Sequence, residues 1–341
     1  MNQRITVLVA AYNGRNYIEE QMDSILAQSQ GGILLVVSDD GSSDGTGDVL
    51  DRYGQMHPAD VLVLHRRTAS GGAAAHFLGL LKMMAELANG RASQAWKADY
   101  DLTQAAGERL IAAAGADYFM LSDQDDVWLP CKAEMLLARM RELEQENALP
   151  TLVHSDLKVV DAYLQEISPS FFKYQKISPE RTRLSQLLVQ NNVTGGAVMM
   201  NSRLLAYLDR LPQVCLMHDA WLALLACCFG QIGWVDRPLY LYRQHGGNAL
   251  GAELGDSLEG AKARLSDGSV ARNNYRLMFG QARCLLAMFG DRLNREQRET
   301  LAAFAELPRK SRFGKIICMI RYGFTKNTIL RTIGQMLFIG D

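Results

Sequence analysis

Three aspartates occupy four consecutive positions in the stretch LSDQDDVW, at residues 121–128, and they follow an apolar run. Carboxylates this close together repel one another unless something neutralises them. One interpretation is an acidic turn in solvent. The other is a cation site, because Mg²⁺ and Mn²⁺ prefer carboxylate oxygens and substrate phosphates as ligands. An Asp-x-Asp pair can give one carboxylate to the ion and the other to a ribose or a metal-bound water.

A second acidic cluster, VVSDDGSSDGT at residues 36–46, ends another β-rich run. Its aspartates can accept a hydrogen bond from a nucleobase N–H or bind a ribose, and Gly41 permits close backbone approach. The alternative is a tight turn followed by a helix that Ser43 or Asp44 caps. Both interpretations can be true at once, since a turn alone does not explain why two acids end this strand.

Alternating strands and helices must position these clusters. Strands are predicted at residues 5–12, 33–40, 60–65 and 117–123, with helical patterns between them. This alternation predicts an α/β fold with a mostly parallel sheet flanked by helices. Ligands bind such sheets beyond the carboxyl ends of the strands. Three polar clusters should meet at that edge: Tyr12-Asn13, Asp39-Asp40 and Asp123 to Asp126.

Length and composition narrow the class of protein. The 341 residues suit one large α/β domain with an appendage. A net charge of -1 gives no global attraction to nucleic acid, so no nucleic-acid partner is expected. The six cysteines form no C-x-x-C pair, which argues against a zinc site and favours a reducing compartment. With no signal-peptide pattern and no run of 18 apolar residues, we expect a cytoplasmic protein.

The C-terminal segment differs in composition from the rest. Residues 307–340 contain seven Lys or Arg and no acid, with apolar residues interleaved. This pattern suits a helix lying on the anionic inner face of the cytoplasmic membrane. It suits equally a basic helix packed on the rest of the chain.

Three motifs, VLVAAYNGRNYIEEQMDSILAQS, LLVVSDDGSSDGT and YFMLSDQDDVW, occur in the order and approximate spacing of family 2 glycosyltransferases. The chain resembles this family over about residues 3–250. SDQDDVW, with the later HDAWLALLACCFG and VDRPLYLYRQHGGN, resembles the branch of bacterial rhamnosyltransferases of cell-surface polysaccharide synthesis. The resemblance implies a GT-A domain at residues 1–250 and a helical, basic extension at 251–341.

The resemblance also implies roles for the residues that match the motifs. The nucleotide would be contacted by Tyr12, Asn13, Asp39, Asp40 and Asp123. The metal, Mg²⁺ or Mn²⁺, would be held by Asp123, Asp125 and His245, with Asp125 as the direct ligand. The catalytic base would be Asp219. The acceptor side would be lined by Thr194, Gly195, Gly196 and His218.

These roles imply an inverting, metal-dependent transferase. A metal across the diphosphate stabilises charge as the glycosidic bond breaks, and one carboxylate activates the acceptor hydroxyl on the opposite face. The donor would be UDP- or dTDP-linked, because an acidic pocket suits a pyrimidine imide N–H. Rhamnose is the candidate sugar. The acceptor would be a growing cell-surface glycan or a lipid-linked hydroxyl.

Several alternatives stand beside this interpretation. Asp219 can simply cap a helix beginning at Ala220, and His245 can be a structural histidine at a strand end. The whole chain can be a catalytically inactive scaffold that binds nucleotide sugars. A nucleotidyltransferase or a dinucleotide oxidoreductase is disfavoured, because neither an arginine-rich glycine loop nor G-x-G-x-x-G follows the first strand.

Two segments depart from the family pattern. Residues 88–116 are longer than the family's usual connection and include a predicted helix at 102–114. We interpret them as a surface elaboration, with a lid or an acceptor platform as alternatives. Residues 69–72 read Ala-Ser-Gly-Gly where the family often has Asn-x-Gly, which weakens a diphosphate role for Arg66 or Arg67.

Overall fold

The computed structural model describes residues 4–91, 98–100, 102–245 and 268–338. Backbone contacts divide the chain into two compact units. The first comprises residues 1–170, 194–211 and 233–251, and the second comprises 171–193, 212–232 and 252–341. Two segments from the middle of the chain therefore group with the C-terminal helices. The boundary predicted at 250/251 lies outside the described residues.

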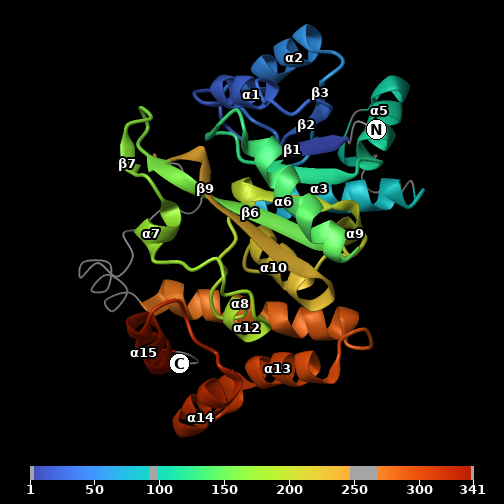
Figure 1. Ribbon diagram of the computed structural model, residues 1–341. Coiled ribbons are helices and arrows are strands. Elements are labelled where there is room, and N and C mark those ends of the chain that lie inside the picture. The colour runs from blue at the N-terminus through green and yellow to red at the C-terminus, as the bar shows by residue number, and fades with distance from the viewer. Residues whose placement is uncertain (1–3, 92–97, 101, 246–267, 339–341) are drawn as a thin grey trace. The chain divides into compact units, whose positions relative to one another are not determined.

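A mixed sheet organises the first unit (Figure 1). Among the described residues its strand order is β3-β2-β1-β4-β8-β6-β9-β5, with β7 beside β6. The strands are β1 (Ile5–Ala11), β2 (Ile33–Asp39), β3 (Val61–His65), β4 (Tyr118–Ser122), β5 (Val127–Trp128), β6 (Thr151–Val160), β7 (Glu166–Ser168), β8 (Val198–Asn201) and β9 (Gln231–Arg243). Strands β1 to β4 pair in parallel, as predicted, whereas β8 pairs antiparallel with β4 and β6, and β5 pairs antiparallel with β9.

Burial of β1 and β4 explains why their sequences are continuous apolar runs. A parallel strand covered on both faces has no solvent side and so needs no alternation. Val7 and Leu8, on opposite faces of β1, are both fully buried, as are Phe119 and Met120 of β4. The flanking helices are α1 (Ile18–Leu26), α2 (Thr46–Met56), α3 (Ala73–Ala88), α5 (Gln104–Ala114) and α6 (Lys132–Glu146), with the short α9 (Ser202–Leu205) after β8.

The described part of the 88–116 segment is integrated into the first unit. Leu110 on α5 is fully buried, and Thr6 of β1 donates a hydrogen bond of 2.8 Å to the carbonyl of Ala113. Arg4 donates to the carbonyl of Gly115 at 2.7 Å. The described residues of this segment therefore add buried side chains to the first unit, and its interpretation as a surface elaboration stays a prediction.

The second unit is helical. Its described helices are α7 (Phe171–Gln175), α8 (Leu184–Leu187), α10 (His218–Phe229), α12 (Gly268–Phe289), α13 (Arg295–Ala305), α14 (Arg312–Tyr322) and α15 (Ile329–Phe338), drawn from green to red in Figure 1. Aromatic side chains form its centre, with the Phe304 ring centroid 5.0 Å from that of Phe279 and 5.1 Å from that of Phe324. Such pairs add to simple area burial. Among the described helices, none is long and apolar enough to cross a bilayer.

Candidate active site

Gln124 joins the first and the third of the predicted clusters at the carboxyl edge of the sheet. Its amide oxygen accepts from the backbone N–H of Tyr12 at 2.7 Å, and its amide nitrogen donates to the carbonyl of Tyr12 at 2.9 Å. Gly14 makes this fit possible, because a Cβ there would lie 2.2 Å from the Gln124 oxygen. The loop after β1 and the loop that carries Asp123 to Asp126 after β4, the acidic loop, are therefore held together, as the topology predicts.

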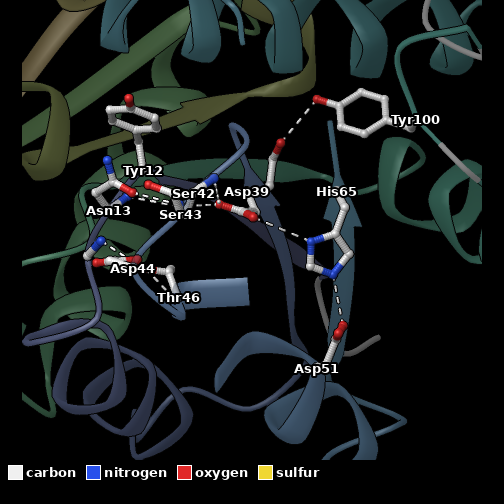
Figure 2. Close-up of polar contacts among 12 residues, drawn as sticks. Tyr12, Asn13, Asp39, Ser42, Ser43, Asp44, Thr46, Asp51, His65 and Tyr100 are labelled. Carbon is white, nitrogen blue, oxygen red and sulfur yellow. Dashed lines mark hydrogen bonds and ion pairs between the residues drawn. The ribbon is translucent and has the colours of Figure 1, made fainter. Parts of the chain in front are cut away.

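Asn13 fastens the end of β1 to the turn after β2 (Figure 2). Its backbone N–H donates to Ser42 Oγ at 2.8 Å, and its side-chain oxygen accepts from the N–H of Ser43 at 2.9 Å. Its φ of 50° lies in the left-handed region, where Asn is among the more tolerant residues. The neighbouring Tyr12 side chain projects outward and is 55% exposed, so a flat ligand can stack on its ring.

Asp39 is buried at the end of β2 and is bound from two sides (Figure 2). One oxygen accepts from the hydroxyl and the N–H of Ser42, and the other lies 3.5 Å from His65 Nδ1. Burial alone would raise the pKa of Asp39, but the bonds from His65 and Ser42 hold it below its usual value. It is therefore an anion held in a fixed orientation.

His65 lies between two carboxylates. Its Nε2 is 2.8 Å from Asp51 Oδ1, and its Nδ1 faces Asp39. The bonds to Asp39 and then to Asp51 outweigh burial and raise the pKa of His65 to about 9. At neutral pH the His65 ring is therefore expected to carry a positive charge, which compensates the negative charges of Asp39 and Asp51.

Asp40 turns toward the loop between β3 and α3. It is 4% exposed, and its two oxygens accept from the N–H of Ser70 at 2.8 Å and from the hydroxyl of Ser70 at 2.7 Å. Arg66 Nε lies 3.1 Å from the same carboxylate. Of the three acids predicted to contact the nucleotide, Asp40 thus also anchors the neighbouring loop.

The aspartates of the acidic loop occupy different environments. Asp125 is partly exposed, and its Oδ2 lies 2.8 Å from Nε2 of His245, whose ring stacks on Tyr17 with centroids 4.7 Å apart. Asp126 is 1% exposed, and only its Oδ1 has a hydrogen-bond partner among the described residues, the N–H of Arg243. Burial, followed by repulsion from Asp125 and Asp123, raises the pKa of Asp126 well above its usual range.

Arg243 is a residue that the sequence interpretation missed. Its Nε donates to the carbonyl of Asp125 at 2.8 Å, its Nη1 donates to the carbonyl of Ala162 at 2.8 Å, and its Nη2 pairs with Glu20 of α1. A planar guanidinium suits this role, because its donors point in fixed directions. The only available signal was an arginine at the end of an apolar strand.

Lys132 is the second missed residue. It is fully buried at the start of α6, where its ammonium lies 3.5 Å from the ring centroid of Trp128 and 4.4 Å from that of Tyr240. It also donates to the carbonyl of Gly196. Burial lowers the pKa of Lys132 well below its usual value, against the attraction of Asp126 and Asp123. A lysine in register with the apolar face of α6, four residues before Leu136, was a readable signal.

Gly196 brings the predicted acceptor segment, Thr194 to Gly196, against the aspartates. A Cβ on Gly196 would lie 3.3 Å from Asp123 Oδ2 and 3.4 Å from Asp126 Oδ2. It would also lie 3.3 Å from the hydroxyl of Tyr240. Glycine is needed here for close approach of the backbone. Gly195 and Gly196 form a short turn, η1 (Gly195–Ala197), which leads directly into β8.

Two of the three predicted metal ligands are in direct contact, Asp125 and His245. Within the part of the chain that the structure describes, no group of three His, Cys, Asp or Glu side chains converges as it would around an ion. The donor chemistry nevertheless fits Mg²⁺ or Mn²⁺, since carboxylate oxygens are joined by one imidazole. The buried Oδ2 of the neighbouring Asp126 has no hydrogen-bond partner among the described residues.

Asp219 and His218 open α10 in the second unit. The helix begins at His218 and its N-cap is Met217, so the alternative that Asp219 caps a helix beginning at Ala220 is wrong. Asp219 lies in the first turn, where its Oδ1 accepts from the N–H of Ala220 at 2.6 Å. Burial lowers the pKa of His218 to about 3, so its imidazole is neutral at physiological pH.

Comparison with known proteins finds similarity to glycosyltransferases. Residues 6–86 match the family model "Glycosyl transferase family 2". The chain is 26% identical to the dTDP-rhamnosyl transferase RfbG of Shigella flexneri over 251 residues, which cover 72% of this chain and 74% of that one. It is 33% identical to the putative teichuronic acid biosynthesis glycosyltransferase TuaG of Bacillus subtilis over 138 residues, 40% of this chain and 42% of that one.

Solved structures share the fold at low sequence identity. The crystal structure of S. aureus TarS gives a TM-score of 0.54 at 15% identity and covers 89% of this chain. This chain spans 43% of that longer protein. A shorter form of TarS in complex with UDP-GlcNAc gives a TM-score of 0.52, also at 15% identity, over 95% of this chain and 93% of the other.

Proposed function

We propose that this chain is a family 2 glycosyltransferase with a GT-A fold and that it inverts the anomeric centre of a UDP- or dTDP-linked sugar. The acceptor is a hydroxyl of a growing cell-surface glycan or of a lipid-linked glycan, and rhamnose is the candidate sugar because of the likeness to RfbG. The contact between Asp125 and His245, beside the buried Asp126, carries the proposal. These clustered carboxyl groups suit a divalent cation, which in turn binds a diphosphate.

The proposed nucleotide site lies at the carboxyl edge of β1 and β2. The exposed ring of Tyr12 offers a stacking surface for the base. The anionic Asp39, held by Ser42 and His65, supplies acceptor oxygens for a pyrimidine imide N–H or a ribose hydroxyl. Asn13 and Asp40 hold the two loops that frame the site.

Asp125, Asp123 and His245 would hold the divalent cation. When bound, a Mg²⁺ or Mn²⁺ ion screens the diphosphate charge that grows as the glycosidic bond breaks. The protein's own contribution is orientation. Arg243 fixes the backbone of Asp125, and Gln124 fixes the loop against Tyr12.

Asp219 is proposed as the general base. Its carboxylate takes the proton of the acceptor hydroxyl while that oxygen attacks the anomeric carbon. The bond from the anomeric carbon to the diphosphate breaks on the opposite face, and the nucleoside diphosphate leaves with the bonding electrons. One displacement of this kind inverts the configuration.

A donor panel tests the proposal. The full chain with Mn²⁺ and UDP-, dTDP- or GDP-linked sugars is assayed for nucleoside diphosphate release, and the anomer of the product is read by NMR. Asp219→Asn should abolish turnover but retain nucleotide binding. Glu306→Gln, which removes an exposed acid paired with Arg309 in the same unit, is the matched control and should leave turnover unchanged. Turnover retained in Asp219→Asn would exclude Asp219 as the base.

The proposal includes contact with an anionic membrane surface through α14. Phe313, Ile317 and Ile320 occur at helical spacing on this helix and are 74%, 50% and 68% exposed. Cys318 and Met319 are buried on its other side, so α14 is packed on one face and open on the other. Exposed apolar residues within a segment rich in Lys and Arg are typical of helices that lie in the lipid interface.

Vesicle sedimentation tests this contact. The chain should sediment with vesicles that contain phosphatidylglycerol and remain in the supernatant with pure phosphatidylcholine. Replacing Phe313, Ile317 and Ile320 together by serine should abolish sedimentation without lowering the melting temperature. A control variant, Met56→Ser, removes a comparably exposed apolar side chain from α2. Equal sedimentation of all forms, or of none, would exclude the α14 face.

A further inference from the structure

Tyr100, a residue of the 88–116 segment, reaches the end of β3. It forms an antiparallel bridge with Arg66, and the backbone N–H of Arg67 donates to the carbonyl of Asp99 at 2.8 Å. The Tyr100 side chain is 3% exposed. The segment that distinguishes this chain from the family pattern therefore places one aromatic side chain beneath the carboxyl edge of the sheet.

The Tyr100 hydroxyl contacts β2, which carries part of the proposed nucleotide site, and Arg66, the residue that follows β3. It lies 3.1 Å from Ser38 Oγ on β2, a contact drawn in Figure 2, and accepts from Arg66 Nη1 at 3.3 Å. The Arg66 guanidinium also lies over the Tyr100 ring, with its carbon 5.3 Å from the centroid. Hydroxyl and ring thus hold the same guanidinium in two ways.

Arg66 carries this constraint to Asp40. Its Nε is 3.1 Å from Asp40 Oδ1 and donates to the carbonyl of Thr68 at 3.1 Å. The Arg66 side chain is 12% exposed, so few of its donors can be satisfied by water. A buried donor that loses its partner costs more than a hydrogen bond gains. The orientation of Arg66, and with it the loop 66–72, therefore depends on Tyr100.

We infer that Tyr100 is a positioning residue of the nucleotide site, which fixes Arg66 and, through Arg66, the carboxylate of Asp40. Nucleoside diphosphate binding then depends on a segment outside the shared motifs. The inference rests on the proposed function, since the ligand is the nucleoside diphosphate named there. It gives the segment a role as a support of the site rather than as a lid or an acceptor platform.

Calorimetric titration of the full chain with UDP and with dTDP, each with Mn²⁺, tests the inference. Tyr100→Phe removes only the hydroxyl and should weaken the binding of whichever nucleotide the wild type prefers by about three- to tenfold, the loss expected for one or two hydrogen bonds. Tyr100→Leu removes the ring as well and should weaken it further. Tyr118→Phe is the matched control. It removes a hydroxyl that bonds Glu144 at 2.7 Å, from a buried tyrosine at the first residue of β4, away from the carboxyl edge of the sheet.

A kinetic assay separates positioning from general stability. Tyr100→Phe should raise the donor KM by the same factor while leaving kcat at saturating donor within about twofold of wild type. Nucleotide affinity within about twofold of wild type in Tyr100→Phe, or an equal loss in Tyr118→Phe, would overturn the inference. Failure of the wild type to bind any nucleotide would instead overturn the proposed function on which it rests.

Discussion

His245 Nε2 lies 2.8 Å from Asp125 Oδ2, although the two residues are 120 positions apart in the chain. The contact joins the end of β9 to the acidic loop after β4. Stacking on Tyr17 holds the imidazole in place, and the guanidinium of Arg243 lies over the same tyrosine ring. The histidine therefore lies against the acidic loop, where both a metal-ligand role and a structural role can be tested.

Removal of the imidazole should weaken metal-dependent binding. In His245→Ala, Asp125 loses its neighbour and the proposed ion loses a ligand, so the Mn²⁺ concentration needed for half-maximal nucleotide binding should rise roughly tenfold or more. The measurement is a Mn²⁺ titration at fixed nucleotide, followed by calorimetry. His57→Ala, which removes a histidine that stacks on Tyr53, serves as the control. An unchanged Mn²⁺ requirement would leave His245 with a structural role only.

Loss of the buried Lys132 side chain should destabilise the fold. Lys132→Met keeps an unbranched side chain but leaves the carbonyl of Gly196 without its donor and Asp126 without its polar neighbour. Leaving a buried polar group without its partner typically costs about 1–3 kcal/mol in the free energy of unfolding. The double variant with Asp126→Asn should recover part of that loss, since the buried acid is gone. Urea unfolding of the three variants measures the coupling, and simple additivity would refute it.

Substitution of Gly196 should disturb the site more than the fold. Its Cβ would lie within 3.4 Å of oxygens of Asp123 and Asp126, so Gly196→Ala must displace the carboxylates. We expect a loss of about 1–3 kcal/mol in the free energy of unfolding and weaker Mn²⁺-dependent nucleotide binding. Gly107→Ala on α5 is the control, because no atom lies within 4 Å of its added Cβ. Unaltered nucleotide affinity in Gly196→Ala would contradict the tight packing.

The charged state of His65 should make stability depend on pH. Its pKa is about 9 in the folded chain against an ordinary value of 6.5. Because the pKa of His65 is raised in the folded chain, its protonated ring stabilises the folded state fully below pH 6.5. This stabilisation is lost as the pH rises through about 9. The difference in free energy of unfolding between wild type and His65→Gln should therefore shrink over that window. The side chain is 43% exposed, so solvent screening will keep the effect small. A difference that grows with pH would exclude the imidazolium.

The sequence predicted the parallel half of the sheet well, because strands buried on both faces leave unambiguous apolar runs. β1, β2, β3 and β4 lie within one or two residues of their predicted ranges, and Tyr12, Asp39 and the acidic loop meet at one edge as expected. The antiparallel half was harder. The pairing of β5 with β9 joins residues over 100 positions apart, and no local pattern encodes it.

Residues that support the site were harder to predict than the acids themselves. Lys132 and Arg243 act through contacts with backbone carbonyls of distant segments, and such partners are invisible in a single sequence. The buried side chains of the 88–116 segment were hard to predict for a related reason. Its small, Ala-rich helix is typical of a surface element, yet Tyr100 and Leu110 are buried.

Nucleotide binding with and without metal tests the central claim most directly. The melting temperature of the full chain is measured with UDP, dTDP and GDP, each with and without Mn²⁺, for wild type and Asp125→Ala. A ligand that binds only the folded state raises the melting temperature by mass action. We predict a rise with UDP or dTDP that requires Mn²⁺ and is absent in Asp125→Ala. No rise with any nucleotide, or an equal rise in Asp125→Ala, would contradict a metal-dependent donor site at the acidic loop.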